Sequence, residues 1–185
     1  MAKVKLNPVL ETFSGKVGDL VFKHYGGGTI LARAPAPPAQ WSSGQAAHRE
    51  QFRLATLYGK AALADPRTKA LYDAKSQATG TPVFALMVAD FFHAPVVDEI
   101  DLSGYHGQAG ETIQVRASDD FEVTGVAVAI RDTAGAVLEQ GAAVSANDSV
   151  WNYTTTATLA DGQHVAIEVS ATDRPGHKGT KTEAR

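Results

Sequence analysis

The sequence predicts an α+β protein in two parts: an N-terminal β-hairpin with about three α-helices, then a C-terminal β-sandwich of about seven strands. Hydrophobic residues recur with a helical period in the first half and alternate with a period of two after Pro95. The charge changes at the same point, because residues 1–94 hold 11 Lys+Arg against 6 Asp+Glu, a net of +5, whereas residues 95–185 hold 6 against 14, a net of −8. We therefore predict two domains, 1–94 and 95–185, linked by His93-Ala94-Pro95.

The composition excludes several classes of protein. The 185 residues are 44% apolar and 20% charged, which is typical of a globular protein and not of a fibre or a disordered tail. The absence of Cys excludes thiol nucleophiles, disulfides, Fe–S clusters and thiolate zinc sites. No apolar run reaches the roughly 20 residues of a membrane span, and the start of the chain lacks a secretory signal. We expect cytoplasmic synthesis and no membrane insertion, with a final location in an assembly, a virion or the cell exterior left open.

The first predicted element is a β-hairpin. Residues 15–25 are rich in β-branched and aromatic side chains, Gly26-Gly27-Gly28 allows a tight reversal, and residues 29–33 form the returning strand. The glycines form a turn rather than a phosphate-binding loop, because the Lys-Ser/Thr of such a loop is missing. Phe22 and Tyr25 lie on opposite faces of the hairpin. Since an isolated two-stranded hairpin is marginal in water, we expect both side chains at an interface with another element or another chain.

A proline-rich connector follows the hairpin. Its three prolines, in residues 34–38, favour an extended, polyproline-like backbone. Trp41 lies between this connector and the next helix. Two interpretations of Trp41 stay open, an exposed anchor for a partner and packing on its own small domain.

The first helix is predicted from Ser42 or Ser43, both suitable N-caps, to about Ala64. Most of its circumference is apolar, so we expect it to be largely buried, with one narrow basic stripe. We interpret the stripe as a solvated face; the alternative is contact with phosphates or an acidic partner. The stripe consists of Arg49, Arg53 and Lys60.

Two further helices are delimited by local signals. Asp65-Pro66 predicts a helix start and Thr79-Gly80 its end. Thr81-Pro82 then introduces a third helix over residues 83–92, which is apolar around nearly its whole circumference and has Asp90 as its only charge. We expect this helix in the core of the small domain or at an assembly interface, with three aromatic side chains as interface candidates: Phe84, Phe91 and Phe92.

From Val96 onward, alternating apolar residues and Gly, Asp or Asn turn signals predict about seven strands. That number of strands in about 90 residues is typical of a small β-sandwich. Trp151 follows the core-facing period of its strand, so we expect it in the core. The predicted strands are 96–102, 113–117, 126–130, 136–140, 151–159, 165–171 and 178–183.

Two short motifs carry a resemblance to a known family. Ala171-Thr172-Asp173-Arg174-Pro175-Gly176-His177 resembles the corner before the last strand of bacterial immunoglobulin-like and fibronectin-III-like modules, with His177 in place of Asn. Residues 117–123 resemble the exit from the second strand of such modules, with Glu122 in place of Gly. The resemblance implies an immunoglobulin-like sandwich without the Cys pair of antibody domains. More loosely, the hairpin at residues 15–19 and the helix at residues 44–58 resemble uncharacterised bacterial and phage-associated proteins with no known activity.

The candidate site residues point away from catalysis. Asp119, Asp120 and Asp173 leave neighbouring strand ends and form a weak Ca²⁺ candidate, but we favour Asx turns, because Ca²⁺ needs 6–8 oxygen ligands. The six histidines show no metal-site spacing, and no Ser lies in a Gly-x-Ser-x-Gly elbow. We therefore predict no metal, no cofactor and no enzymatic activity.

Three functions are compatible with these patterns. We favour a structural or interaction protein, a self-assembling subunit of a filament, virion or tail-like assembly, because the hairpin needs a partner and the two halves have opposite charge. The first alternative is a nucleic-acid-binding module that uses the basic N-terminal half. The second is a sandwich that binds carbohydrate or another surface, for which a row of exposed aromatic side chains would be expected.

Overall fold

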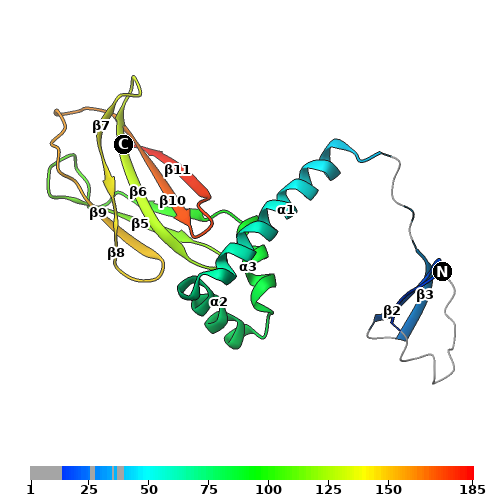
Figure 1. Cartoon of the computed structure of the whole chain (residues 1–185). Coiled ribbons are helices and arrows are strands. Elements are labelled where there is room, and N and C mark those ends of the chain that lie inside the picture. The colour runs from blue at the N-terminus through cyan, green and yellow to red at the C-terminus, as the bar shows by residue number, and fades with distance from the viewer. Residues whose placement is uncertain (1–13, 26–27, 35, 37–39) are drawn as a thin grey trace. The chain divides into compact units, whose positions relative to one another are not determined.

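The computed structural model describes residues 14–25, 28–34, 36 and 40–185. Contacts divide the chain into two compact units, residues 1–46 and 47–185 (Figure 1). The domain boundary predicted at 94/95 therefore lies inside the second unit. The change from helices to strands does occur there, but the helices pack on loops of the sandwich and form one unit with it.

The first unit contains a three-stranded antiparallel sheet in the order β1 (Gly15–Val17), β2 (Leu20–Tyr25) and β3 (Gly28–Arg33). The predicted hairpin is confirmed as β2–β3, and β1 is an additional strand. The register pairs Val17 with Leu20 across β1–β2 and Phe22 with Leu31 across β2–β3. Since paired residues lie on the same side of a sheet, these four apolar side chains share one face.

The three predicted helices are present as α1 (Ser43–Ala64), α2 (Pro66–Thr79) and α3 (Val83–Phe92). The backbone N–H of Gln45 donates to Ser42 Oγ at 3.2 Å, and that of Ser42 donates to Gln45 Oε1 at 3.0 Å, which forms a capping box before α1. The Asp65 side chain accepts the first free N–H groups of α2. Gly80 ends α2 with φ of 73°, a left-handed conformation that favours glycine.

One expectation about α1 was wrong. The helix was predicted to be largely buried, yet only Ala55, Gly59 and Ala62 are buried in it, and Phe52 and Leu57 are about half exposed. The three helices form a small apolar cluster, centred on Ala62, Tyr72 and Met87, that is too small to enclose both sides of α1. Among the described residues, no helix is both long and apolar enough to cross a membrane.

The rest of the second unit consists of two four-stranded antiparallel sheets that face each other. The strands are β4 (Val96–Asp101), β5 (Thr112–Ser118), β6 (Val123–Asp132), β7 (Val137–Ala142), β8 (Val144–Ser145), β9 (Val150–Thr154), β10 (Val165–Asp173) and β11 (Lys178–Ala184). One sheet has the order β11-β10-β6-β7 and the other the order β4-β5-β9-β8. Eight strands are thus present where about seven were predicted, because β8 is too short to show an alternating pattern.

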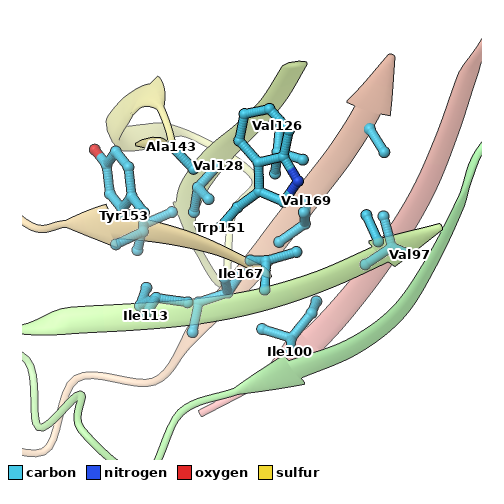
Figure 2. Packing of buried hydrophobic residues seen from close by; sticks show 14 of the residues in the cluster. Val97, Ile100, Ile113, Val126, Val128, Ala143, Trp151, Tyr153, Ile167 and Val169 are labelled. Carbon is cyan, nitrogen blue, oxygen red and sulfur yellow. The ribbon is translucent and has the colours of Figure 1, made fainter. Parts of the chain in front are cut away.

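The core of the sandwich lies between these two sheets (Figure 2). Alternate residues of the central strands point inward, so Ile113 and Val115 of β5 meet Ile167 and Val169 of β10, all of them fully buried. Trp151 lies in this core at 8% exposure, as the period of its strand indicated. Its strand is shorter than predicted, since β9 ends at Thr154.

Candidate functional site at the junction of helices and sandwich

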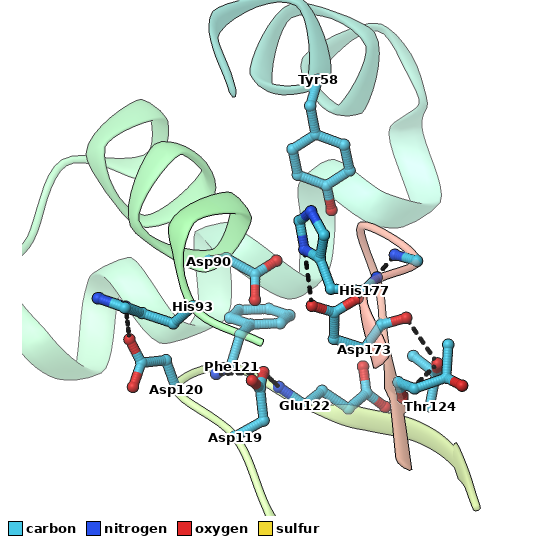
Figure 3. A network of polar contacts seen from close by, with 12 residues as sticks. Tyr58, Asp90, His93, Asp119, Asp120, Phe121, Glu122, Thr124, Asp173 and His177 are labelled. Atoms are coloured by element: carbon cyan, nitrogen blue, oxygen red, sulfur yellow. Dashed lines mark hydrogen bonds and ion pairs between the residues drawn. The ribbon is translucent and has the colours of Figure 1, made fainter. Parts of the chain in front are cut away.

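The helices pack at one end of the sandwich, and this junction buries the carboxyl group of Asp90. Asp90 is the only ionisable residue of α3, and it is 1% exposed. Its carboxyl lies beside the ring of Phe121, which belongs to the β5–β6 loop (Figure 3). A buried carboxylate is costly unless it is neutralised or well paired, so its neighbours determine the properties of the junction.

A chain of hydroxyl groups leads to this carboxyl. Tyr72 of α2 donates its hydrogen to Asp90 Oδ2, and the hydroxyl oxygens of Tyr58 and Tyr72 are 2.8 Å apart. Because the hydrogen of Tyr72 is used on Asp90, Tyr58 of α1 is the donor in the second hydrogen bond. The Tyr72 ring stacks on Phe121 with 3.9 Å between ring centroids. All three helices and the sandwich therefore meet in one network of side-chain contacts.

The environment raises the pKa of all three hydrogen-bonded groups, Tyr58, Tyr72 and Asp90. Burial, and then the negative charges of Asp119 and Asp173, raise the pKa of Asp90 to about 6, although the hydrogen bond from Tyr72 opposes the shift. Burial and donation to Asp90 raise the pKa of Tyr72 far above its usual value, and burial raises that of Tyr58. The second oxygen of Asp90, Oδ1, has no hydrogen-bond partner among the described residues. Asp90 therefore keeps its proton up to a higher pH in the folded protein than an aspartic acid does in water.

The three aspartates of the Ca²⁺ candidate lie at this junction, but each is used locally (Figure 3). Asp119 Oδ2 accepts the N–H groups of Phe121 and Glu122, both at 3.0 Å. Asp173 Oδ1 accepts those of Gly176 and His177, at 2.7 and 2.6 Å. The Asp120 carboxylate pairs instead with His93 at the end of α3. Asp119 and Asp173 thus make the Asx turns that we favoured, and the described residues contain no group of three or more His, Cys, Asp or Glu placed to hold a metal ion.

An open groove of about 810 Å³ lies beside the junction, between α2 and the end of the sandwich. Its cations are already engaged, because Lys75 donates to the backbone oxygen of Asp120 and Arg174 pairs with Glu122. Lys75 also lies 4.9 Å from the centroid of the Phe121 ring. The first contact connects α2 to the sandwich, and the second connects the β5–β6 loop to the β10–β11 loop, which is a structural role.

The predicted interface aromatics have different environments. Phe91 is half-buried inside the junction, where its ring contacts Tyr58 and meets His177 edge-on at 4.8 Å. Phe92 lies against His48 and Phe52 of α1, and Phe84 packs on Gly59 of α1 while staying 38% exposed.

The aromatics before α1 are less enclosed. Trp41 is 47% exposed and Phe22 is half-buried on its sheet. The side chain of Tyr25 lies outside the described residues.

The basic stripe of α1 lies on the surface. Arg49, Arg53 and Lys60 are all exposed. Arg53 forms a double hydrogen bond with Glu50, at 2.8 and 2.6 Å, which cancels part of the positive charge and raises the pKa of the guanidinium. The same helical layer exposes large apolar side chains on either side of the stripe. These are Phe52, Leu54, Leu57, Leu63, Leu71 and Phe84.

Sequence reasoning missed the role of Asp90. The available signal was its position as the single charge of an otherwise apolar helix, which is compatible with a buried carboxyl as well as with a narrow solvated face. Tyr72 gave no signal, because its contacts with Asp90 and Phe121 join residues 18 and 49 positions apart in the sequence.

Comparisons with known proteins add little. No protein-family model and no curated protein matches this sequence. The chain is similar to CopC from Methylosinus trichosporium OB3b, at 17% identity and a TM-score of 0.37 over 50% of this chain and 90% of CopC. It is also similar to an engineered protein, at 21% identity and a TM-score of 0.38 over 49% of this chain and 19% of that protein.

Proposed function

We propose that this protein is a non-catalytic interaction protein that assembles with further copies of itself, as a subunit of a filament, a virion or a tail-like assembly. The observation that supports this proposal is the sheet of the first unit. One face carries the apolar side chains of Val17, Leu20, Phe22 and Leu31, and on this face Val17 is 60% and Leu20 43% exposed. A small sheet with exposed apolar side chains is marginal in water, and docking on a partner would stabilise it.

Two further features support assembly. The exposed apolar side chains of the helical layer provide a second surface that association would cover. The opposite charges of the two halves, +5 and −8, favour contacts between unlike surfaces of neighbouring copies. Contacts of this head-to-tail kind produce rings or filaments rather than closed dimers.

We also propose that the sandwich is immunoglobulin-like, as its corner motifs suggested. If β4 to β11 are named A, B, C, C′, D, E, F and G in chain order, one sheet has the order A-B-E-D and the other the order C′-C-F-G. Constant-type immunoglobulin domains pair ABED against CFG. The buried Trp151 lies on strand E of this scheme, whereas antibody domains have their Trp on strand C.

The absence of catalysis is part of the proposal. Of the aspartates of the junction, Asp90 is buried from solvent, Asp119 and Asp173 are occupied with turns, and Asp120 is paired with His93. A catalytic carboxylate must reach a substrate, and these groups hold the fold together instead.

Light scattering on the purified full chain tests the proposal. We expect the mass to rise with protein concentration at low salt and to fall as salt screens the opposite charges. Electron microscopy of the same sample should show particles, tubes or filaments. A strict monomer at high protein concentration and low salt would overturn the proposed function.

A further inference from the structure

The two edges of the sandwich differ in their protection against strand pairing. At one edge β4 and β11 lie beside each other, and the ammonium of Lys181 donates to the backbone oxygen of Asp98 at 2.6 Å. This edge is rich in charged side chains, a usual device against pairing with another chain. The charged residues of β4 and β11 are Asp98, Glu99, Asp101, Lys178, Lys181 and Glu183.

The opposite edge, formed by β7 and β8, has no exposed charge on either strand. Val137 is 43% exposed, Leu138 37% and Val144 73%, which makes Val144 the most exposed large apolar residue in the second unit. The only charged residue of the two strands is Glu139, and it is buried. An uncharged edge with exposed aliphatic side chains is a template for an additional strand.

Glu139 also fixes the position of β7. Its carboxylate accepts the Tyr153 hydroxyl at 2.8 Å and the N–H of Ala157 at 3.0 Å, and these hydrogen bonds hold β7 to the inner side of the sandwich. Between Ala127 and Ile130 of β6 the pairing with β7 is regular. In the part of the chain that the structure describes, β7 is the last strand of its sheet, so no strand pairs with its outer side.

The first unit of another copy suits this edge in strand length, and its net charge is opposite to that of the sandwich as a whole. Among the described residues, β3 is the last strand of its own sheet, and it has six residues, as β7 has. Residues 1–46 hold five Lys+Arg and two Asp+Glu, a net of +3, against −8 for residues 95–185. The exposed apolar side chains of the helices suit this sheet less well, because the basic stripe defined above lies among them.

We propose that β3 of one copy adds to the outer edge of β7 of a second copy, so that the sheet β11-β10-β6-β7 continues through β3, β2 and β1. Backbone hydrogen bonds would join the strands, and the apolar face of the small sheet would cover Val144. The two surfaces differ, so each copy can donate one sheet and accept another. This inference rests on the proposed function and specifies its interface.

Lysine substitution at the edge provides the first test. Leu138→Lys and Val144→Lys each place a charge on an exposed edge position and should leave the fold intact. The matched control is Val96→Lys, the same change at a 56% exposed valine on the β4 edge. We expect the protein concentration needed for assembly to rise at least about tenfold in the two β7–β8 variants and to stay as in wild type in the control. Assembly of Val144→Lys and Leu138→Lys at the wild-type concentration would overturn the inference but not the proposed function.

Disulfide trapping identifies the occupant, and the chain offers a clean background because it has no Cys. Gln140→Cys on β7 is mixed with either Ile30→Cys or Ala32→Cys on β3, and each protein carries a single Cys. Under oxidation we expect the mixed disulfide to dominate in at least one mixture, because paired strands bring Cα atoms within the range that a disulfide needs. The control is Thr180→Cys on β11, which should form no mixed disulfide. Dominance of Gln140→Cys homodimers would show β7–β7 pairing and overturn the inference.

Pairing of β3 with β7 of the same chain is the remaining outcome. It would give an intramolecular disulfide in the double variant Ala32→Cys/Gln140→Cys, a monomeric mass and no mixed disulfide. That result would contradict both this inference and the proposed function. If this inference alone fails, the wild-type chain still assembles and the two lysine variants assemble at the wild-type concentration. If the proposed function fails, the wild-type chain has a monomeric mass.

Discussion

Tyr72 donates its hydroxyl hydrogen to the carboxyl of Asp90, and both side chains are almost completely removed from solvent. The hydrogen bond joins α2 to α3, while the stacking of Tyr72 on Phe121 joins the helices to the sandwich. A buried acid at this position makes the stability of the second unit depend on pH, in a direction that the structure determines.

Asp90→Asn tests that dependence. Because the folded protein raises the pKa of Asp90 to about 6, it binds a proton more tightly than the unfolded chain does. The stabilising effect of protonation is complete below the unfolded pKa near 4 and is lost as the pH rises through about 6. We therefore expect Asp90→Asn to gain stability relative to wild type as the pH rises from 5 to 7.5, by about 1.4 kcal/mol, because about one pKa unit of the shift lies above pH 5.

Urea unfolding at both pH values measures this difference in free energy. Asp73→Asn is the matched control, because it makes the same Asp→Asn change at a surface residue of α2, which pairs with Lys69, and removes no buried carboxyl. Parallel pH profiles for wild type and Asp90→Asn would show that the buried carboxyl has no raised pKa.

Tyr72→Phe should destabilise the second unit at neutral pH by about 1–3 kcal/mol, because it leaves the buried Asp90 without its donor. The loss should shrink at pH 4.5, where a protonated Asp90 needs no donor. Tyr58→Phe is the control, since Tyr58 is only half-buried and contacts Tyr72 rather than the carboxyl. Equal losses for the two variants would contradict the role given to Tyr72.

Glu139→Gln should show the opposite dependence on pH. Burial alone would raise the pKa of Glu139, but hydrogen bonds from the N–H groups of Thr156 and Ala157 and from Tyr153 lower it below its usual value. The stability that the carboxylate supplies is therefore present above pH 4.5 and is lost as the pH falls through the lowered pKa. We expect the variant to lose about 1–3 kcal/mol at pH 7. Thermal unfolding at pH 7 and pH 3.5 checks this, and a loss that grows at the lower pH would contradict it.

Gly141→Ala should destabilise the sandwich by about 1–3 kcal/mol. A Cβ atom at Gly141 would lie 2.9 Å from Cε2 of Tyr153, a buried ring with little room to move. Gly125→Ala on the neighbouring strand β6 is the control, because no atom lies within 4 Å of its Cβ position. Calorimetry on both variants should show a lower melting temperature for Gly141→Ala alone.

The basic stripe of α1 provides a test of the nucleic-acid alternative. Arg53 is partly neutralised by Glu50, and we expect replacement of Arg49, Arg53 and Lys60 by Ala to leave the retention of DNA or RNA at low salt as it is in wild type. Binding that depends steeply on salt and disappears in this variant would favour the alternative. A gel-retardation series in increasing salt measures both properties.

Local chemistry explains what the sequence predicted well. The ends of α2 follow from Asp65-Pro66 and Thr79-Gly80, whose cap geometry depends only on neighbouring residues. The core position of Trp151 follows from strand periodicity. By contrast, β8 has two residues and no period to detect, and α1 was expected to be buried because its apolar residues were counted without knowing how little packs against them.

The division of the chain was harder to predict, because it depends on contacts between distant segments. The period and the charge both change at Pro95, yet Phe121 and His177, from loops of the sandwich, pack against side chains of the helices. These contacts are invisible in a linear pattern. Similarly, the turns that Asp119 and Asp173 cap were readable from their motifs, whereas the burial of Asp90 beside them was not.

The distribution of the two tryptophans gives each unit its own optical reporter. Trp41 belongs to the first unit and is 47% exposed, whereas Trp151 is 8% exposed in the sandwich core. Their emission should therefore separate into a red-shifted component that acrylamide quenches readily and a blue-shifted component that it quenches poorly. A Trp41→Phe variant would isolate the signal of the sandwich, and Trp151→Phe that of the first unit. Unfolding of the sandwich and docking of the small sheet can then be followed as separate events in the same cuvette.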